Sequence, residues 1–322
     1  MRKIEIVVPK GTKYVSEIKD FELPNGILNK GIPNCGATTL ALTDRHKTIV
    51  CSPRNNLLVN KHEQYGKTLL VVGGVTESEI EQYVRCAETP KILVSYDSFQ
   101  KVAGCIDDKS DWRVVVDEFQ YLLSDSGFKS EVEHRFMAYL KQFEYVTFLS
   151  ATPILDKYIG QISDFMNIPY YQMKWQDVEK IKVIRVRTPR PIDAAVEIVR
   201  SYQQGAFPRM EIDGTTVYSK ECVIFLNSVN NILNIIKQTG LKHDEVNIIV
   251  GNSADNDSQI KKLGADFTNG RIPLKEEKHK MFTFCTSTAF AGCDFYSTNA
   301  TSFVISDSKR VNTAIDIATD LV

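Results

Sequence analysis

The stretch Trp112-Arg-Val-Val-Val-Asp-Glu-Phe-Gln120 indicates both the type of fold and the part of it that carries chemistry. Its three consecutive valines are typical of a strand that is buried on both faces of a parallel sheet. Asp117 and Glu118 follow where this strand ends, and the carboxyl ends of parallel strands form the crevice in which α/β proteins bind ligands. Taken alone, the acidic pair is also compatible with a solvated turn.

Similar short apolar runs alternate with helical segments on both sides of this stretch, a pattern typical of parallel sheets covered by helices. In the first half we expect strands at 4–8, 26–30, 48–52, 68–73, 91–95, 112–117 and 145–150, and helices at 77–87 and 130–143. The alternation weakens at 153–180. In the second half we expect strands at 180–187, 222–227, 246–251, 281–286 and 302–307, and helices at 191–204 and 229–240.

The predicted fold class is therefore α/β, with two units in tandem, 1–180 and 181–322, and a hairpin inserted at 207–221 around an Asp-Gly turn. The length of 322 residues fits two domains of about 150 residues each. With 43% hydrophobic and 25% charged residues, the composition is that of a soluble globular protein.

Charge and cysteine content exclude several classes of protein. The net charge of −1 excludes a histone-like basic protein or an acidic tail protein, but leaves room for a local basic groove. No apolar run approaches the roughly 18 residues of a membrane span, and the N-terminus does not resemble a signal peptide. The seven cysteines are scattered and never spaced Cys-x-x-Cys, which favours reduced thiols and a cytoplasmic location.

A second candidate site is the loop GIPNCGATT (31–39), which follows the predicted strand at 26–30. It matches the phosphate-loop pattern GxxxxGK[ST] except at the lysine, where this chain has Ala37. Glycines let backbone N–H groups face phosphates, and the Thr38 hydroxyl would bind Mg²⁺. An ordinary glycine turn is an equally good interpretation of the loop alone. Lys30, immediately before the loop, is a candidate source of the missing charge, or else a solvated loop lysine.

Two further predicted strand ends carry small polar residues. Ser150-Ala-Thr-Pro follows the strand at 145–150, and TSTAFAGCD (286–294) follows the strand at 281–286. Each alone is compatible with a Ser/Thr-rich turn or a structural glycine. The informative feature is that all four segments agree in order, spacing and placement at strand ends.

Jointly, these segments resemble the motifs of the superfamily 2 DEAD/DEAH-like helicases and translocases, which have two RecA-like domains. Motifs I, II, III and V are represented by 31–39, 117–120, 150–153 and 286–294. Softer matches to motifs Ia, Ib and IV occur at 51–60, 94–101 and 223–228.

The resemblance implies an ATP-dependent helicase or translocase that couples Mg²⁺-ATP hydrolysis to domain closure on a DNA or RNA backbone. It assigns catalysis to Asp117, Glu118 and Gln120, with Gln120 sensing the γ-phosphate, and coupling to Ser150 and Thr152. The residues that it assigns to ATP are Lys30, Gly31, Gly36, Ala37, Thr38, Thr39, Gly292 and Asp294, and those assigned to the metal are Thr38 and Asp117. The residues that it places near nucleic-acid phosphates are Pro53, Arg54, Ser98, Asn227 and Thr286.

The chain departs from the family pattern at its C-terminal end. The helix expected at 311–322 runs out where motif VI, which supplies the arginine finger, should begin. Because such a finger contributes about 10³–10⁵ in rate, the resemblance implies that this chain alone hydrolyses ATP weakly.

Two alternatives remain at this point. A non-catalytic helicase-like scaffold, which binds nucleic acid with a decayed nucleotide site, is favoured by Ala37 and disfavoured by the intact Asp117-Glu118 pair. A phosphate-loop kinase or another nucleotide-binding enzyme would explain 31–39 and 117–120, but it would leave the two other segments as coincidences.

Overall fold

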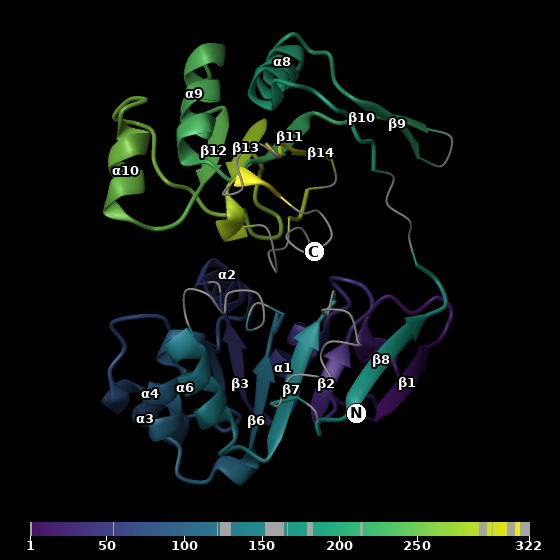
Figure 1. Ribbon diagram of the computed structural model, residues 1–322, viewed down its shortest axis with the longest axis vertical. Helices are drawn as coiled ribbons and strands as arrows, with labels where there is room; N and C mark the ends of the chain where they lie inside the picture. The colour runs from purple at the N-terminus through teal and green to yellow at the C-terminus, as the bar shows by residue number, and fades with distance from the viewer. Residues whose placement is uncertain are drawn as a thin grey trace. The chain divides into compact units, whose positions relative to one another are not determined.

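The computed structural model describes the chain in two compact units, Met1–Ile181 and Lys182–Val322 (Figure 1). The residues described are 2–53, 55–120, 122, 130–151, 164–165, 167–178, 183–212, 215–289, 295–297, 299–307 and 313–315. The helix expected at 311–322 lies mostly outside this set.

The first unit is built on an eight-stranded sheet in the order β1-β8-β2-β7-β6-β3-β5-β4, and its described strand pairs are all parallel. Figure 1 shows β3, β6, β7, β2, β8 and β1 side by side. The strands are β1 (Lys3–Val8), β2 (Gly26–Asn29), β3 (Lys47–Ser52), β4 (Leu69–Val71), β5 (Lys91–Ser95), β6 (Trp112–Val116), β7 (Tyr145–Ser150) and β8 (Tyr170–Trp175). The helices are α1 (Ala37–Thr43), α2 (Asn55–Tyr65), α3 (Glu77–Cys86), α4 (Phe99–Gly104) and α6 (Ser130–Leu140), with short 3₁₀ turns η1 (Val15–Glu17), η2 (Tyr96–Ser98) and η3 (Lys109–Asp111).

Helices cover both faces of this sheet, which explains why its central strands are largely apolar. Ile27 and Ile49 pack on one face with residues of α3, α4 and α6. Leu28 and Val50, their neighbours in sequence, pack on the other face with residues of α1 and α2. Successive side chains of a strand point to opposite faces, so a strand covered on both sides needs an unbroken apolar run.

One strand, β8, falls in a stretch where the sequence predicted none. It lies between β1 and β2 and pairs in parallel with both. Tyr170 is fully buried, and its hydroxyl accepts a hydrogen bond from Asn29 Nδ2 at 3.0 Å. Trp175 Nε1 donates to the Lys30 carbonyl at 2.6 Å. Because aromatic residues with hydrogen-bonded polar tips replace aliphatic ones here, the strand lacks the pattern used to predict it.

Gly26, the first residue of β2, occupies a position that only glycine fits. Its φ is +147°, and an added Cβ would lie 2.5 Å from the Pro169 carbonyl oxygen. We expect Gly26→Ala to lower the free energy of unfolding by about 2–4 kcal/mol, because strain and overpacking add. Denaturant unfolding measures this, with Gly104→Ala as the control because its Cβ would meet nothing within 4 Å. Equal stability of the two variants would contradict the prediction.

The second unit contains a smaller parallel sheet in the order β12-β13-β11-β14. Its elements are α8 (Pro191–Gln203), β11 (Glu221–Phe225), α9 (Val229–Thr239), β12 (Val246–Ile249), α10 (Ala254–Lys261), β13 (Phe282–Cys285), η4 (Ser287–Ala289) and β14 (Ala300–Val304). Ser228 caps the start of α9 by accepting from Asn231 N, and Gly240 ends that helix with φ +66°. A separate antiparallel pair, β9 (Arg209–Ile212) and β10 (Thr215–Tyr218), forms a hairpin. The predicted α/β fold class with mostly parallel sheets is confirmed.

The strand predicted at 180–187 is wrong over its described part. Residues 183–187 form neither helix nor strand, and Val183, Ile184 and Val186 are 62%, 76% and 79% exposed. Alternating β-branched residues favour an extended backbone, but a strand also requires a hydrogen-bonded neighbour, and no described strand pairs with this segment. None of the described helices has the length and apolar character needed to cross a membrane.

Candidate active site

Three neighbouring strands of the first unit, β2, β7 and β6, end at the same edge of the sheet. Lys30 follows β2, and its backbone N–H donates to the carbonyl of Ser150, the last residue of β7, at 2.8 Å. Asp117 follows β6, and its backbone N–H donates to the Cys51 carbonyl at 2.9 Å. The parallel topology therefore brings segments from three distant parts of the sequence to one place.

A buried lysine and two buried carboxylates form the centre of this edge. Lys30 Nζ lies 3.5 Å from Asp117 Oδ1 and 3.5 Å from Glu118 Oε1. The three residues are 7%, 4% and 4% exposed. Burial alone would lower the pKa of Lys30, but the charges of Asp117 and Glu118 outweigh it and hold that pKa above its usual value. Lys30 is therefore a charged group held against both acids.

The loop before α1 brings a hydroxyl to the same cluster. Thr38 Oγ1 donates to Asp117 Oδ2 at 2.7 Å. Gly31 and Gly36 have φ values of +74° and +79°, in the left-handed region that favours glycine. Ala37 packs in the core with residues of α1 and the sheet.

Thr39 is held by a different partner, since its hydroxyl accepts from Tyr65 on α2 at 2.7 Å. The interactions of the cluster therefore join Lys30, Thr38, Asp117 and Glu118, whereas Ala37 packs in the core and Thr39 bonds to Tyr65.

Glu118 has the features of a general base. Burial raises its pKa, the Lys30 charge lowers it, Asp117 raises it again, and the net pKa lies above the usual value. Its backbone has φ +52°, a strained conformation for a residue other than glycine. Gln120 Nε2 donates to its carboxylate, whereas the buried Gln120 Oε1 has no hydrogen-bond partner among the described residues. That acceptor is available to a ligand or a water molecule.

A segment that the sequence analysis did not single out supports the loop. The backbone N–H of Val15 donates to the Cys35 carbonyl at 2.8 Å. The ring of Tyr14, half exposed, lies against Gly36, where an added Cβ would be 3.4 Å from it. Glu17 ties the segment together by accepting from the backbone of Lys13 at 2.8 Å. No motif spans the distance between these residues and the loop, so the sequence carries no signal for the contact.

The other predicted site residues fall into three groups. In the first unit, Pro53 follows β3, and Ser98 in η2 accepts a hydrogen bond from Ser95 at 3.1 Å. In the second unit, Asn227 Oδ1 accepts from Ser287 N at 3.1 Å, beside Thr286, whose hydroxyl lies 3.2 Å from that of Thr288. Outside the described residues lie Arg54, Thr152, Gly292 and Asp294.

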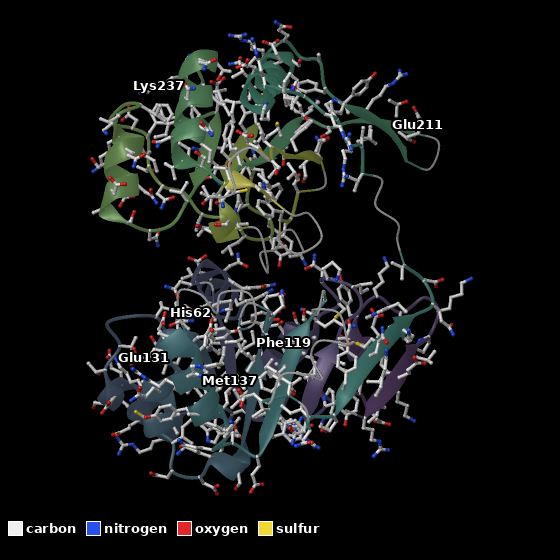
Figure 2. All side chains as sticks on the ribbon, in the orientation of Figure 1. His62, Phe119, Glu131, Met137, Glu211 and Lys237 are labelled. Atoms are coloured by element: carbon white, nitrogen blue, oxygen red, sulfur yellow. The ribbon has the colours of Figure 1, made fainter. Side chains whose placement is uncertain are left out.

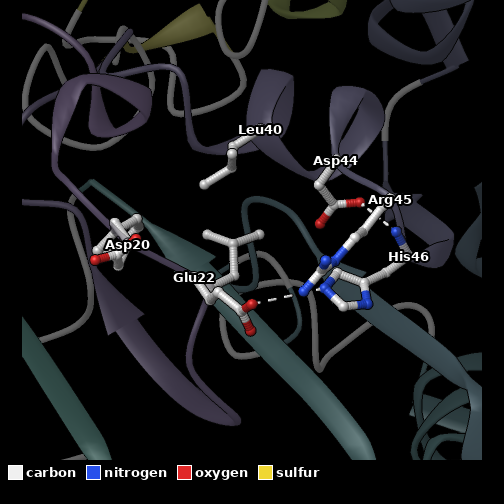
Figure 3. A pocket seen from close by; sticks show the side chains of 8 residues that line it. Asp20, Glu22, Leu40, Asp44, Arg45 and His46 are labelled. Atoms are coloured by element: carbon white, nitrogen blue, oxygen red, sulfur yellow. Dashed lines mark hydrogen bonds and ion pairs between the residues drawn. The ribbon is translucent and has the colours of Figure 1, made fainter.

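A cavity of about 300 Å³ lies elsewhere on the first unit, between 20–23 and the end of α1 with the residues that follow it (Figure 3). Its charges are largely paired. Glu22 contacts His46 at 3.8 Å and accepts from Arg113 at 2.8 Å, a hydrogen bond that lowers the pKa of Glu22. No residue of the Lys30 cluster lines this cavity, so we do not assign the chemistry to it.

Comparisons with known proteins agree with this architecture. No protein-family model and no curated protein matches the chain. Among solved structures, the chain is similar to the DEAD-box helicase Mss116 bound to ssRNA and UDP-BeF, with a TM-score of 0.59 at 14% identity, over 100% of this chain and 73% of that one. It is also similar to S. cerevisiae Dbp5 bound to RNA and ADP BeF3, with a TM-score of 0.56 at 14% identity, over 92% and 74%.

The chain therefore shares its fold, tandem RecA-like α/β units with parallel sheets, with these two solved helicases. The resemblance inferred from the sequence motifs is confirmed at the level of the fold.

Proposed function

We propose that this chain is an ATP-dependent helicase or translocase, which binds Mg²⁺-ATP at the carboxyl ends of β2, β6 and β7 and uses its hydrolysis to act on DNA or RNA. The observation that carries the proposal is the position of Lys30, which is buried 3.5 Å from each of two carboxylates. A cation at this place compensates for the lysine that the loop lacks at Ala37.

The residues at this edge suit both parts of the proposed ligand. Thr38 Oγ1 and Asp117 Oδ2, 2.7 Å apart, are hard oxygen donors of the kind that Mg²⁺ prefers. When bound, the metal would neutralise phosphate charge and help to orient the transferred group. Gln120 Oε1, which has no hydrogen-bond partner among the residues that the structure describes, offers a buried acceptor beside Glu118. The residues present at this edge therefore have the chemistry that a site for a nucleotide and its metal requires.

The proposed steps use side chains of the first unit. Lys30 neutralises charge on the outer phosphates, and Asp117 with Thr38 holds the metal. Glu118 accepts a proton from the attacking water, because its raised pKa makes it a stronger base than an ordinary glutamate. Gln120 orients the Glu118 carboxylate through its amide. Ser150, at the end of β7 beside Lys30, is proposed to transmit these changes.

Nucleic acid is the proposed partner because both of the similar helicase structures described above were solved with RNA. Pro53, Ser98, Asn227 and Thr286 are the described residues proposed to meet its backbone. The roles of Arg54, Thr152, Gly292 and Asp294, and the cytoplasmic location, stay predictions.

The second candidate function is a non-catalytic scaffold that binds nucleic acid. Ala37 favours it, because the loop residue that usually contacts phosphates is absent. The buried Lys30 cluster argues against it, since burying three charged groups is costly without a use for them.

The test is a titration of a fluorescent ATP analogue with Mg²⁺, on the wild-type chain and on Asp117→Ala. We expect saturable binding that depends on Mg²⁺ and weakens at least about tenfold in the variant, a loss of about 1.4 kcal/mol. Asp111→Asn, an exposed acid of the same unit, is the control and should bind like the wild type. No binding by the wild type at millimolar nucleotide would favour the scaffold.

A further inference from the structure

Residues 180–190, KIKVIRVRTPR, are the most basic stretch of the sequence, with five basic residues and no acidic one in a chain whose net charge is −1. We call the described part of this stretch, 183–190, the basic strap; it holds three of the five basic residues. The described part, 183–190, leads into α8 and has neither helix nor strand (Figure 1). Neither the proposed ATP site nor the family motifs include it.

Two arginines of the basic strap have no partner among the described residues. Residues 183–190 are all exposed. Within the described part of the chain, Arg185 and Arg187 make no hydrogen bond or ion pair. Arg190 lies 3.8 Å from Asp193, but both side chains are largely exposed, so this pair contributes little. The guanidinium groups are therefore available to an anion.

The same segment also exposes apolar surface that a partner would cover. Val183, Ile184 and Val186 are among the most exposed large apolar side chains of the described residues. In an extended chain, Arg185 and Arg187 share one side at a spacing of about 7 Å, with Ile184 and Val186 on the other. A ligand that carries regularly spaced negative charge and apolar faces matches this arrangement.

We propose that the basic strap is a binding site for the phosphate backbone of single-stranded nucleic acid. Arginine is the side chain best suited to phosphate, and the aliphatic residues can contact sugars and bases. A protein strand would pair through the backbone and would make no use of the arginine charges. An anionic membrane favours amphipathic helices, whereas 183–190 are not helical. The choice of nucleic acid rests on the proposed function; the site does not involve the Lys30 cluster.

The experiment measures fluorescence anisotropy of short labelled oligo-dT and oligo-U with the full chain, without nucleotide, over a range of salt concentrations. Each neutralised phosphate of a single strand contributes about 0.7 to the slope of log K against log salt. We expect Arg185→Gln/Arg187→Gln to reduce the slope by about 1.4 and to weaken binding about 25-fold at 0.1 M salt. The control, Lys237→Gln/Lys242→Gln, removes two exposed charges of the second unit, one on α9 (Figure 2), and should leave the slope unchanged.

Several results would overturn the proposal. These are an unchanged slope in the arginine variant, an equal change in the control, or binding to phosphatidylserine vesicles in place of both oligonucleotides. Amide hydrogen exchange gives a second readout on the wild type. We expect rapid exchange at 183–188 in the free protein and slower exchange with oligonucleotide, whereas protection in the free protein would show a paired strand and contradict the assignment.

Failure of the strap and failure of the proposed function give different results. If the arginine variant binds oligonucleotide like the wild type while Mg²⁺-ATP binding is intact, only the strap assignment is wrong. If the wild type binds ATP but neither oligonucleotide, both the strap and the nucleic-acid part of the proposed function are wrong.

Discussion

Replacing Lys30 with methionine is expected to weaken Mg²⁺-ATP binding about 100-fold, because a charged contact of this kind contributes about 1.5–3 kcal/mol. The same change leaves Asp117 and Glu118 buried without the cation that lies 3.5 Å from each. Breaking a buried ion pair in this way costs about 3–5 kcal/mol of stability. The measurements are nucleotide titration and denaturant unfolding of the same preparation.

A matched control separates loss of stability from loss of the ligand. Lys91 is also buried, and its ammonium pairs with Asp44 and donates to the Ala41 carbonyl at 2.7 Å. Lys91→Met should therefore destabilise the first unit to a similar extent while leaving nucleotide affinity nearly unchanged. Lys30→Arg keeps the charge and should recover part of the affinity. If Lys30→Met binds nucleotide as tightly as Lys91→Met does, Lys30 is a structural ion-pair partner only.

Replacing Glu118 with glutamine is expected to slow ATP hydrolysis by about 10²–10⁴ while leaving nucleotide affinity within a few-fold. The amide has the size of the carboxylate and can still meet Gln120, but it cannot accept the proton of the attacking water. Single-turnover phosphate release in the presence of nucleic acid measures the effect. Glu81→Gln, an exposed position on α3, is the control and should hydrolyse like the wild type.

The pH profile adds an independent check on the same residue. Burial raises the pKa of Glu118, and a general base works only when it is ionised. The wild-type rate should therefore fall as pH is lowered through this raised pKa, at a higher pH than an ordinary glutamate would give. An acid limb that persists unchanged in the residual activity of Glu118→Gln would assign it to another group.

Strands were predicted correctly where burial on both faces of the sheet leaves an apolar run in the sequence, and incorrectly where other factors decide. The continuous valines of β6 predict a strand because burial on both faces leaves no room for polar residues. β8 instead places the fully buried Tyr170 and the partly buried Trp175 in the sheet, each with its polar tip hydrogen-bonded, and the aliphatic pattern is absent. The strand predicted at 180–187 fails for the opposite reason, because local alternation cannot supply a pairing partner.

Some contacts of the candidate site could be predicted from the sequence, and others could not. That Asp117 and Thr38 lie together could be predicted, because both stand at strand or loop ends of a parallel sheet. For Lys30 the sequence left two interpretations, a source of the missing charge or a solvated loop lysine. The structure places its ammonium 3.5 Å from a carboxylate oxygen of both Asp117 and Glu118, and its role in nucleotide binding stays a prediction. The packing of Tyr14 on Gly36 depends on a tertiary contact between segments with no shared motif, and nothing in the sequence pattern reveals it.

The hydrogen bond from the Trp175 indole to the Lys30 carbonyl gives the protein an internal optical probe. The chain has two tryptophans, and the other, Trp112, is 3% exposed at the start of β6. Indole emission responds to changes in its own hydrogen bond and solvation, so a shift of the Lys30 backbone is recorded at Trp175. If the proposed nucleotide shifts the Lys30 backbone, its binding would change the intrinsic fluorescence, with no dye attached and no turnover required.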